Sequence, residues 1–301
     1  MRIGINRPTG ITWAIASTNG GAAFITDASA LTNGRVADVT RVQWDTGVQS
    51  TSVTVTLTAT LGKTISASNC ALLMANISTS LPIGVSVQFS GKLGIGAVAL
   101  GGNTTGSRTV AGPWGNSIIP CVFPAVQIDT LIITISNDKN GSMWATAGQL
   151  FDLGEVWVGE GADFDVANDI SFNAEGGTLQ RQSHNNQQWP LMVQPYFSIP
   201  VNLTAMPVAV AVGPNPAQYD FQTVIAAMVT QSTTVIIPKY MVEGADPLTT
   251  GQPPPSITSS NIDAQMLART FCLGCVDQAP KMTRDGQQYF ISPFTFGENP
   301  P

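Results

Sequence analysis

The chain has 301 residues, enough for about two domains that each bury a core. Only 11% of the residues are charged, where an ordinary soluble domain has about 25%, and the formal net charge is -6. This composition excludes a disulfide-stapled miniprotein, a disordered chain and a coiled coil, and a pI near 4.6 argues against nucleic-acid binding, which needs clustered Lys and Arg. So few charges also predict that something else covers much of the surface.

The first residues contain neither the apolar core nor the cleavage site of a secretory signal. No run of about 18 apolar residues predicts a transmembrane helix, so we expect no membrane insertion. In a reducing cytosol the four cysteines are expected to remain thiols. They are Cys70, Cys121, Cys272 and Cys275.

The first half is predicted to be a succession of short strands. Apolar and polar residues alternate in residues 53–59, 85–90 and 131–136, which is typical of strands with one wet face. Turn residues such as Thr32-Asn33-Gly34 separate such segments. This spacing predicts an N-terminal β-sandwich, like a jelly roll, over residues 1–160.

The second half, residues 161–301, is predicted to be an antiparallel β domain with one packed helix at about 216–232. Asn215 suits the N-cap of that helix and Pro216 its first turn. The helix is expected to lie on a sheet through one apolar stripe. The stripe consists of Phe221, Ile225, Met228 and Val229.

Residues suited to catalysis are few. The single histidine, His184, lies in an Asn/Gln-rich run, and the sequence has no nucleophile elbow and no phosphate-binding or dinucleotide-binding loop. A glycosidase would need two carboxylates about 5 to 9 Å apart, which sequence spacing does not identify. We therefore expect no enzymatic activity and no cofactor.

Cys272 and Cys275 have the CxxC spacing with which two thiolates meet one metal ion on a tight turn. They are weak metal candidates, because a second CxxC is missing and Cys70 and Cys121 lie in apolar runs typical of buried residues. The favoured interpretation is structural thiols and no metal site.

An acidic stretch follows residue 154. Asp163-Phe164-Asp165 offers oxygen ligands for calcium, but the residues lack the order of a calcium loop. A solvated or interface-facing acidic surface is the favoured interpretation. The stretch holds Glu155, Glu160, Asp163, Asp165, Asp169 and Glu175.

Trp114 and Asn116 are the candidate glycan-binding residues. They lie in Gly112-Pro113-Trp114-Gly115-Asn116, where an indole stacks on a sugar ring while an amide bonds its hydroxyls. The alternative, that Trp114 belongs to the core or to a subunit contact, is favoured over the sugar site.

Four segments carry packing patterns that occur together in one family. The chain resembles the structural proteins of the tail tip, distal tail or baseplate, of long-tailed bacteriophages, whose sandwich domains are similar to carbohydrate-binding jelly rolls. The matching segments are Leu31-Thr32-Asn33-Gly34-Arg35 through Thr40-Arg41-Val42-Gln43-Trp44, Cys70 through Gly84, Phe151-Asp152-Leu153-Gly154-Glu155-Val156-Trp157-Val158-Gly159, and Ala268 through Pro301.

The resemblance implies a virion protein of a phage tail, made in the cytoplasm of the host bacterium. Such a protein assembles into a ring with copies of itself and with other tail or baseplate proteins. Its alternative role is recognition of a host surface glycan by the sandwich domain. We expect the ring contacts to come from the second domain, through the polar run 180–188 and the loop 244–261.

Overall fold

The computed structural model describes residues 1–17, 22–35, 38–44, 54–74, 85–100, 105–106, 110–111, 117–137, 150–164, 173–182, 188–212, 220–230, 233–241, 261–263, 266–267, 270–276 and 279–298. Within these residues the fold is mainly antiparallel β, as predicted, with one packed helix of ten residues. No helix among them is long and apolar enough to cross a membrane.

The N-terminal half is built on two long, paired strands, β5 (Thr54–Met74) and β10 (Ser117–Asn137). Their sheet also contains β2 (Thr12–Ser17), β6 (Val85–Leu93), β7 (Gly96–Val98), β8 (Thr105–Gly106) and β9 (Val110–Ala111). A second sheet, β3 (Ala22–Phe24), β4 (Thr40–Trp44) and β11 (Leu150–Leu153), packs across it together with the short helix η1 (Ala28–Thr32). One apolar core joins the layers, with Leu31, Val42 and Leu153 on one side and Leu57 and Ile133 on the other.

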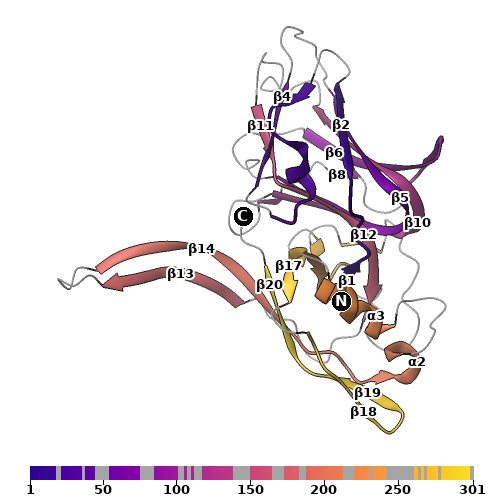
Figure 1. Ribbon diagram of the computed structural model, residues 1–301, viewed down its shortest axis with the longest axis vertical. Helices are drawn as coiled ribbons and strands as arrows, with labels where there is room; N and C mark the ends of the chain where they lie inside the picture. The colour runs from indigo at the N-terminus through magenta and orange to yellow at the C-terminus, as the bar shows by residue number, and fades with distance from the viewer. Residues whose placement is uncertain are drawn as a thin grey trace.

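The two halves share one continuous sheet (Figure 1). β1 (Arg2–Ile5) lies between β12 (Glu155–Asp163) and β16 (Thr234–Ile237), so the first strand of the chain joins the sheet of the second half. β12 begins against β5 and ends against β1, and residue 160 falls within it. The sheet continues from β16 through β17 (Cys272–Val276) and β20 (Phe294–Glu298).

Trp157 fills the junction between the halves. Its buried indole lies against the backbones of Gly4 and Gly159, where an added Cβ would stand 2.7 and 2.6 Å from ring carbons. Only glycine permits this approach of β1 and β12 to the ring. The indole belongs to a core cluster that includes Leu73 of the first half and Phe271 of the second.

The predicted helix is present as α3 (Phe221–Thr230). Asp220, not Asn215, caps it, since the Thr223 N–H donates to the Asp220 carboxylate over 2.8 Å. The predicted start at residue 216 lies outside the described residues. A single turn, α2 (Val208–Ala211), precedes α3.

The buried face of α3 differs from the predicted stripe. Phe221, Val224 and Met228 are buried, Ile225 packs at their edge, and Val229 is 61% exposed. The inclusion of Val229 was therefore wrong, and Val224 takes its place because the stripe follows positions i, i+3 and i+7.

Two hairpins complete the second half. β18 (Met282–Asp285) pairs with β19 (Gln288–Ile291). β19 also pairs with β15 (Met206–Pro207), which lies beside α2. β13 (Asn173–Gln182) and β14 (Gln188–Val201) form the other hairpin, which extends away from the body as an arm (Figure 1).

Candidate functional site

The predicted glycan residues, Trp114 and Asn116, lie outside the described residues. The strands on either side of them are described: β9 pairs with the start of β10, with Ala111 opposite Ser117. The segment that carries Trp114 therefore connects two neighbouring strands of the sandwich. His184 also lies outside the described residues, between β13 and β14.

Cys272 and Cys275 lie in strand β17 and not on a turn. Positions three apart in a strand point to opposite faces of the sheet, and Cys272 is buried while Cys275 is exposed. Two thiols on opposite faces of a sheet do not chelate one ion together. Among the described residues no group of His, Cys, Asp and Glu suits a metal ion.

A serine scan of this pair is expected to distinguish the two faces. Cys275→Ser should change the free energy of unfolding by less than about 0.5 kcal/mol, because the residue is exposed. Cys272→Ser should cost about 1 to 3 kcal/mol, because its hydroxyl is buried among apolar side chains. Denaturant titrations measure both. Stoichiometric zinc or iron in the parent, lost in the double variant, would contradict this assignment.

Two carboxylates of the acidic stretch are not solvated. Glu155 is fully buried and Asp163 largely so, and each is paired with an arginine from the start of the chain. The prediction of a solvated or interface-facing acidic face was therefore wrong for these two carboxylates. Asp165 and Asp169 lie outside the described residues.

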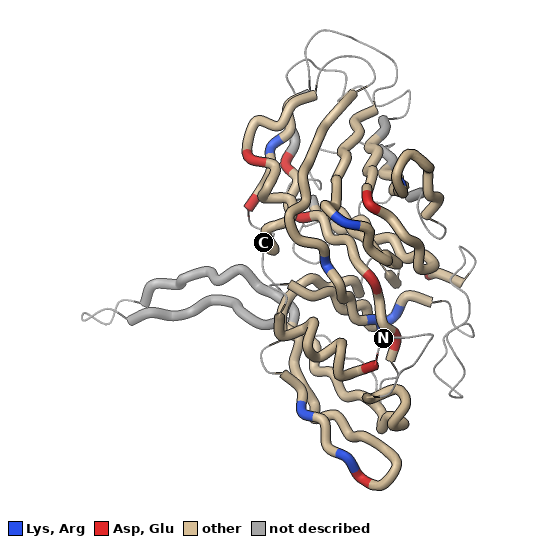
Figure 2. The backbone as a smooth tube through the Cα atoms, turned by 45° about the vertical axis from the view of Figure 1, so that its right-hand side comes forward, with Lys and Arg blue, Asp and Glu red and all other residues tan. Residues whose placement is uncertain are grey.

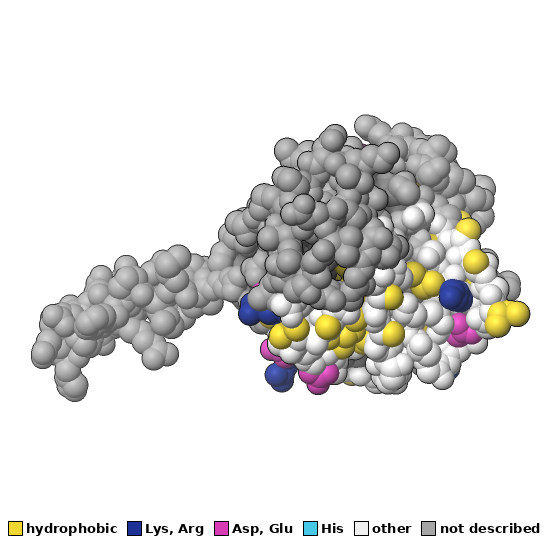
Figure 3. All heavy atoms as spheres, turned by 90° about the horizontal axis from the view of Figure 1, so that it is seen from above, with side chains coloured by type: hydrophobic (Ala, Val, Ile, Leu, Met, Phe, Trp, Pro, Cys, Tyr) yellow, Lys and Arg dark blue, Asp and Glu magenta, His cyan; other side chains and the backbone are white. Residues whose placement is uncertain are grey.

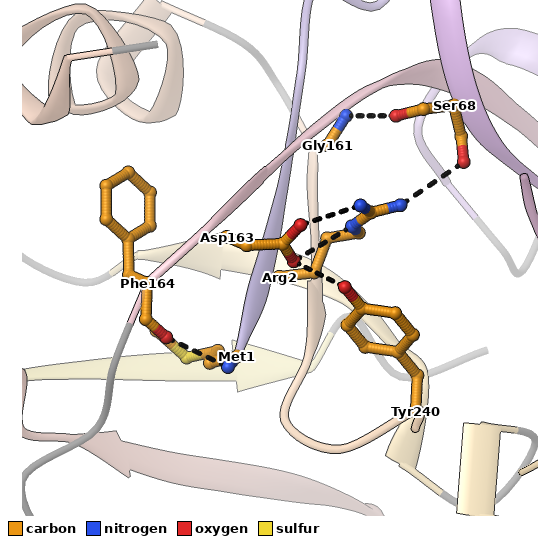
Figure 4. A network of polar contacts seen from close by, with 7 residues as sticks. All are labelled: Met1, Arg2, Ser68, Gly161, Asp163, Phe164 and Tyr240. Atoms are coloured by element: carbon orange, nitrogen blue, oxygen red, sulfur yellow. Dashed lines mark hydrogen bonds and ion pairs between the residues drawn. The ribbon is translucent and has the colours of Figure 1, made fainter. Parts of the chain in front are cut away.

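The first buried pair joins β1 to the end of β12 (Figure 4). The Arg2 guanidinium donates to both carboxylate oxygens of Asp163, at 3.0 and 2.7 Å, and lies 4.9 Å from the centre of the Tyr240 ring. The Tyr240 hydroxyl donates to the same carboxylate over 2.8 Å. Around this pair Arg2 also donates to the Ser68 carbonyl, and the Met1 amino group donates to the Phe164 carbonyl.

These contacts keep Asp163 ionised in the interior. Burial alone would raise the pKa of Asp163, but the charge and hydrogen bonds of Arg2 outweigh burial and hold that pKa below its usual range. The pair thus fixes β1, β12 and the segment after β16 against one another. Its groups are engaged with each other, which suits a structural role.

The second buried pair joins Arg7 to Glu155. Arg7 contacts the Glu155 carboxylate and the Thr233 hydroxyl, and the Gly34 N–H donates to the other Glu155 oxygen over 3.1 Å. Burial raises the pKa of Glu155 to about 7, although Arg7 and the Gly34 N–H act in the opposite direction. Three segments distant in the sequence therefore meet on one carboxylate.

The raised pKa of Glu155 predicts a pH-dependent stability. A carboxyl whose pKa is higher in the folded chain than in the unfolded chain stabilises the fold at low pH, and this contribution is lost as the pH rises through about 7. From pH 5 to pH 8 the loss should be about 2 to 3 kcal/mol, at about 1.4 kcal/mol per pKa unit.

Glu155→Gln isolates this effect, because glutamine keeps the shape and does not titrate. The difference in unfolding free energy between parent and variant, measured with urea at pH 5 and pH 8, should shift by that amount in favour of the variant at pH 8. An unchanged difference would show that Glu155 does not titrate in this range.

The third pair, Arg41 of β4 and Asp152 of β11, ties the strands of the smaller sheet together. The two guanidinium contacts measure 2.7 and 2.9 Å, but Arg41 is 45% exposed. Described basic and acidic positions of both signs are distributed along the backbone (Figure 2). The described surface seen from above is mainly uncharged (Figure 3).

The β13–β14 arm has open hydrogen-bonding edges on both of its strands along most of its length. β13 pairs with β14 alone, and β14 pairs with β20 only at Ser198–Val201. The arm beyond this point is a two-stranded ribbon about 30 Å long, from ten residues at about 3.3 Å each. Among the described residues no third strand pairs with the arm beyond Ser198. An isolated two-stranded ribbon is marginal in water.

The polar run predicted to make ring contacts maps onto the distal end of this arm. Gln182 and Gln188 are register partners where the strands meet the connecting residues 183–187. The other predicted contact segment, 244–261, lies outside the described residues except for Asn261.

No protein-family model matches this sequence, and no curated protein matches it. The similar solved structures are carbohydrate-binding β-sandwich domains. A CBM32 module of a family 31 glycoside hydrolase from Clostridium perfringens is 10% identical, with a TM-score of 0.33 over 51% of this chain and 96% of its own. The family 32 module of C. perfringens NanJ, solved with galactose, is 17% identical, with a TM-score of 0.32 over 52% and 98%.

The C-terminal domain of a chitobiase from Bacteroides fragilis is 15% identical, with a TM-score of 0.33 over 52% of this chain and 100% of its own. Each of these similarities covers about half of the chain at a TM-score below 0.5. No functional residue is transferred from them.

Proposed function

We propose that this chain is a non-catalytic structural subunit that joins copies of itself into a ring through the β13–β14 arm. In this proposal it belongs to the tail tip or baseplate of a long-tailed bacteriophage, as the sequence resemblance implies. The observation that carries the proposal is the arm, a ribbon that leaves the body with both backbone edges open along most of its length.

The composition of the arm supports an interface. Glu175 and Arg181 are the only Asp, Glu, Lys or Arg residues between Asn173 and Val201. Natural proteins protect open strand edges with charges or cover them, because bare edges aggregate. Pro190 and Pro195 remove two backbone donors from β14, but β13 carries no proline and only two charges, so a strand or surface of a neighbouring subunit would cover its edge.

The rest of the chain supports a rigid subunit. Buried ion pairs and the Trp157 cluster lock the two halves together, and they leave the arm as the projecting part. A total of 11% charged residues suits a surface covered by neighbours, and an acidic ring does not retain DNA that passes through it.

Light scattering coupled to size-exclusion chromatography tests this proposal on the full chain. The expected mass is that of an oligomer, at least twice the 31.6 kDa of one chain, and it should persist on dilution to micromolar concentration. A monomer at every concentration would refute self-assembly.

Glycan recognition by the N-terminal sandwich is the second candidate function. The observation that favours it is that Trp114 and Asn116 lie in sequence between β9 and β10, two strands that pair with each other. Trp114→Ala should abolish binding to a galactose-containing glycan in calorimetry, because stacking on the sugar ring is lost. Phe290→Ala, a change at an exposed aromatic residue of β19, is the control. Equal binding by both variants would remove Trp114 from the site.

A further inference from the structure

Cys70 of β5 and Cys121 of β10 are neighbours in the core of the sandwich. The two residues are register partners in the antiparallel β5–β10 pair, and both are fully buried in the same core cluster. Opposite residues of antiparallel strands lie on one face of the sheet, so their side chains interact. Burial raises the pKa of the Cys70 thiol, and the neighbouring Cys121 thiol raises it further. The two thiols are therefore close enough to influence each other.

The backbone around this pair suits a disulfide. Cα atoms of opposite residues in antiparallel strands are about 4.5 to 5.5 Å apart, and residues joined by a disulfide have Cα atoms about 4.4 to 6.8 Å apart. Closing the bond brings the two Cβ atoms to within about 4.5 Å, the shorter end of the range for opposite residues. Pairing is regular on both sides of the two cysteines, and the nearest register shift follows Val122. A bond between the two sulfur atoms therefore requires no change of register.

The other two cysteines do not lie opposite a cysteine. Cys272 of β17 is the register partner of Ile236, and Cys275 is that of Gly297. They also point to opposite faces of their own strand. All four cysteines are among the described residues, and the pair between β5 and β10 is the only one in register. One specific bond is therefore the expected product of oxidation within a chain.

We infer that Cys70 and Cys121 form a redox site, which consists of two thiols in a reducing compartment and is closed to a disulfide by a disulfide oxidant such as oxidised glutathione. One cysteine thiolate attacks the oxidant and releases one glutathione thiolate, and the second cysteine thiolate then attacks the mixed disulfide and releases the other. Two electrons pass from the pair to the oxidant, and the two thiol protons are taken up by the two glutathione thiolates. The inference concerns the sandwich alone and does not depend on the proposed assembly.

Burial controls how fast this bond forms. Thiol–disulfide exchange needs a thiolate that the oxidant can reach. Both thiols are fully buried, and the raised pKa of Cys70 keeps its thiolate fraction small near neutral pH. The folded chain should therefore exchange slowly, and the bond should form during folding or during transient opening of the strand pair.

The bond acts as a covalent staple of the sandwich. It joins β5 to β10 and closes the loop from residue 70 to residue 121, which contains β6, β7, β8 and β9. A closed loop lowers the conformational entropy of the unfolded chain, so the oxidised chain should unfold at a higher urea concentration than the reduced chain. A chain that leaves a reducing cytosol gains this stability without a change at its surface, because both cysteines are buried.

A glutathione redox titration of the full chain with Cys275→Ser tests the inference. The substitution removes an exposed thiol that could otherwise link two chains. The chain is equilibrated with mixtures of reduced and oxidised glutathione, in native buffer and in concentrated urea, starting from the reduced and from the oxidised form. The balance of disulfide and thiols gives the effective concentration of the pair. This concentration should be at least about tenfold higher in native buffer, because the fold holds the two sulfur atoms together.

Peptide mapping of the oxidised chain should find Cys70 linked to Cys121 and should find Cys272 as a thiol. Cys272 is the internal control, because its register partner is Ile236. A smaller ratio between native buffer and urea would overturn the inference, since the fold would then not favour the bond. A disulfide that includes Cys272 would overturn it as well.

Discussion

Asp163→Ala is expected to lower the free energy of unfolding by about 3 to 5 kcal/mol at neutral pH. This is the usual cost of removing one partner from a buried ion pair, because the remaining charge stays in the interior without compensation. Here the charge is Arg2, which is 4% exposed and donates two hydrogen bonds to Asp163. The Tyr240 hydroxyl loses its acceptor as well. Urea unfolding followed by tryptophan fluorescence measures the loss.

Asp152→Ala is the matched control for this experiment. It removes the carboxylate partner of Arg41, but that arginine is 45% exposed and water can solvate it. Asp152 itself is buried, but the charge left behind is half-exposed, so the expected cost is smaller than for Asp163→Ala, about 1 kcal/mol. Equal losses in the two variants would show that the junction pair is no more important than this half-exposed pair.

The strands could be predicted where one face of the strand is exposed to solvent. Residues 53–59 alternate regularly, and 54–59 form the start of β5. The same strand continues to Met74 through an apolar run that shows no alternation. The reason is burial on both faces: Cys70 and Leu72 belong to the sandwich core, while Ala71 and Leu73 belong to the junction cluster.

The helix was located correctly, but its buried face was predicted with Val229 where the structure has Val224. Asn215 with Pro216 and Asp220 are both plausible helix starts, and local sequence does not choose between them. A start at Phe221 and burial of Val224 in place of Val229 follow from how the helix meets β1 and β17. That choice depends on tertiary packing, which outweighs local preference.

The buried ion pairs could not be predicted from sequence. Arg2 and Asp163 are 161 residues apart, and Arg7 and Glu155 are 148 apart. No periodicity links such positions, because their contact depends on β1 joining the sheet between β12 and β16. The acidic residues could be identified in the sequence, but their arginine partners could not. For this reason the stretch was predicted to be a solvated or interface-facing surface.

Shortening the β13–β14 arm is expected to abolish self-association and leave the body folded. Glu175 and Tyr196 are direct register partners near the base of the arm, so residues 176–195 can be replaced by an Asn-Gly turn. The pairing of β14 with β20 at Ser198–Val201 is retained. The melting temperature of the dissociated variant should therefore report an intact body.

A second variant separates the arm strands from their tip. Gln182 and Gln188 are also register partners, so an Asn-Gly turn can replace residues 183–187 alone. This variant keeps both open edges of the ribbon. If backbone edges carry the contact, it should assemble like the parent, whereas loss of assembly would place the contact on the polar tip.

The mass of the parent and the arm-shortened chain, measured side by side by light scattering, tests the central claim most directly. The account predicts a stable oligomer for the parent and a folded monomer for the variant. The far-ultraviolet circular dichroism of the variant should differ from that of the parent only by the contribution of the deleted ribbon. An arm-shortened chain that forms the same oligomer as the parent would contradict assembly through the arm.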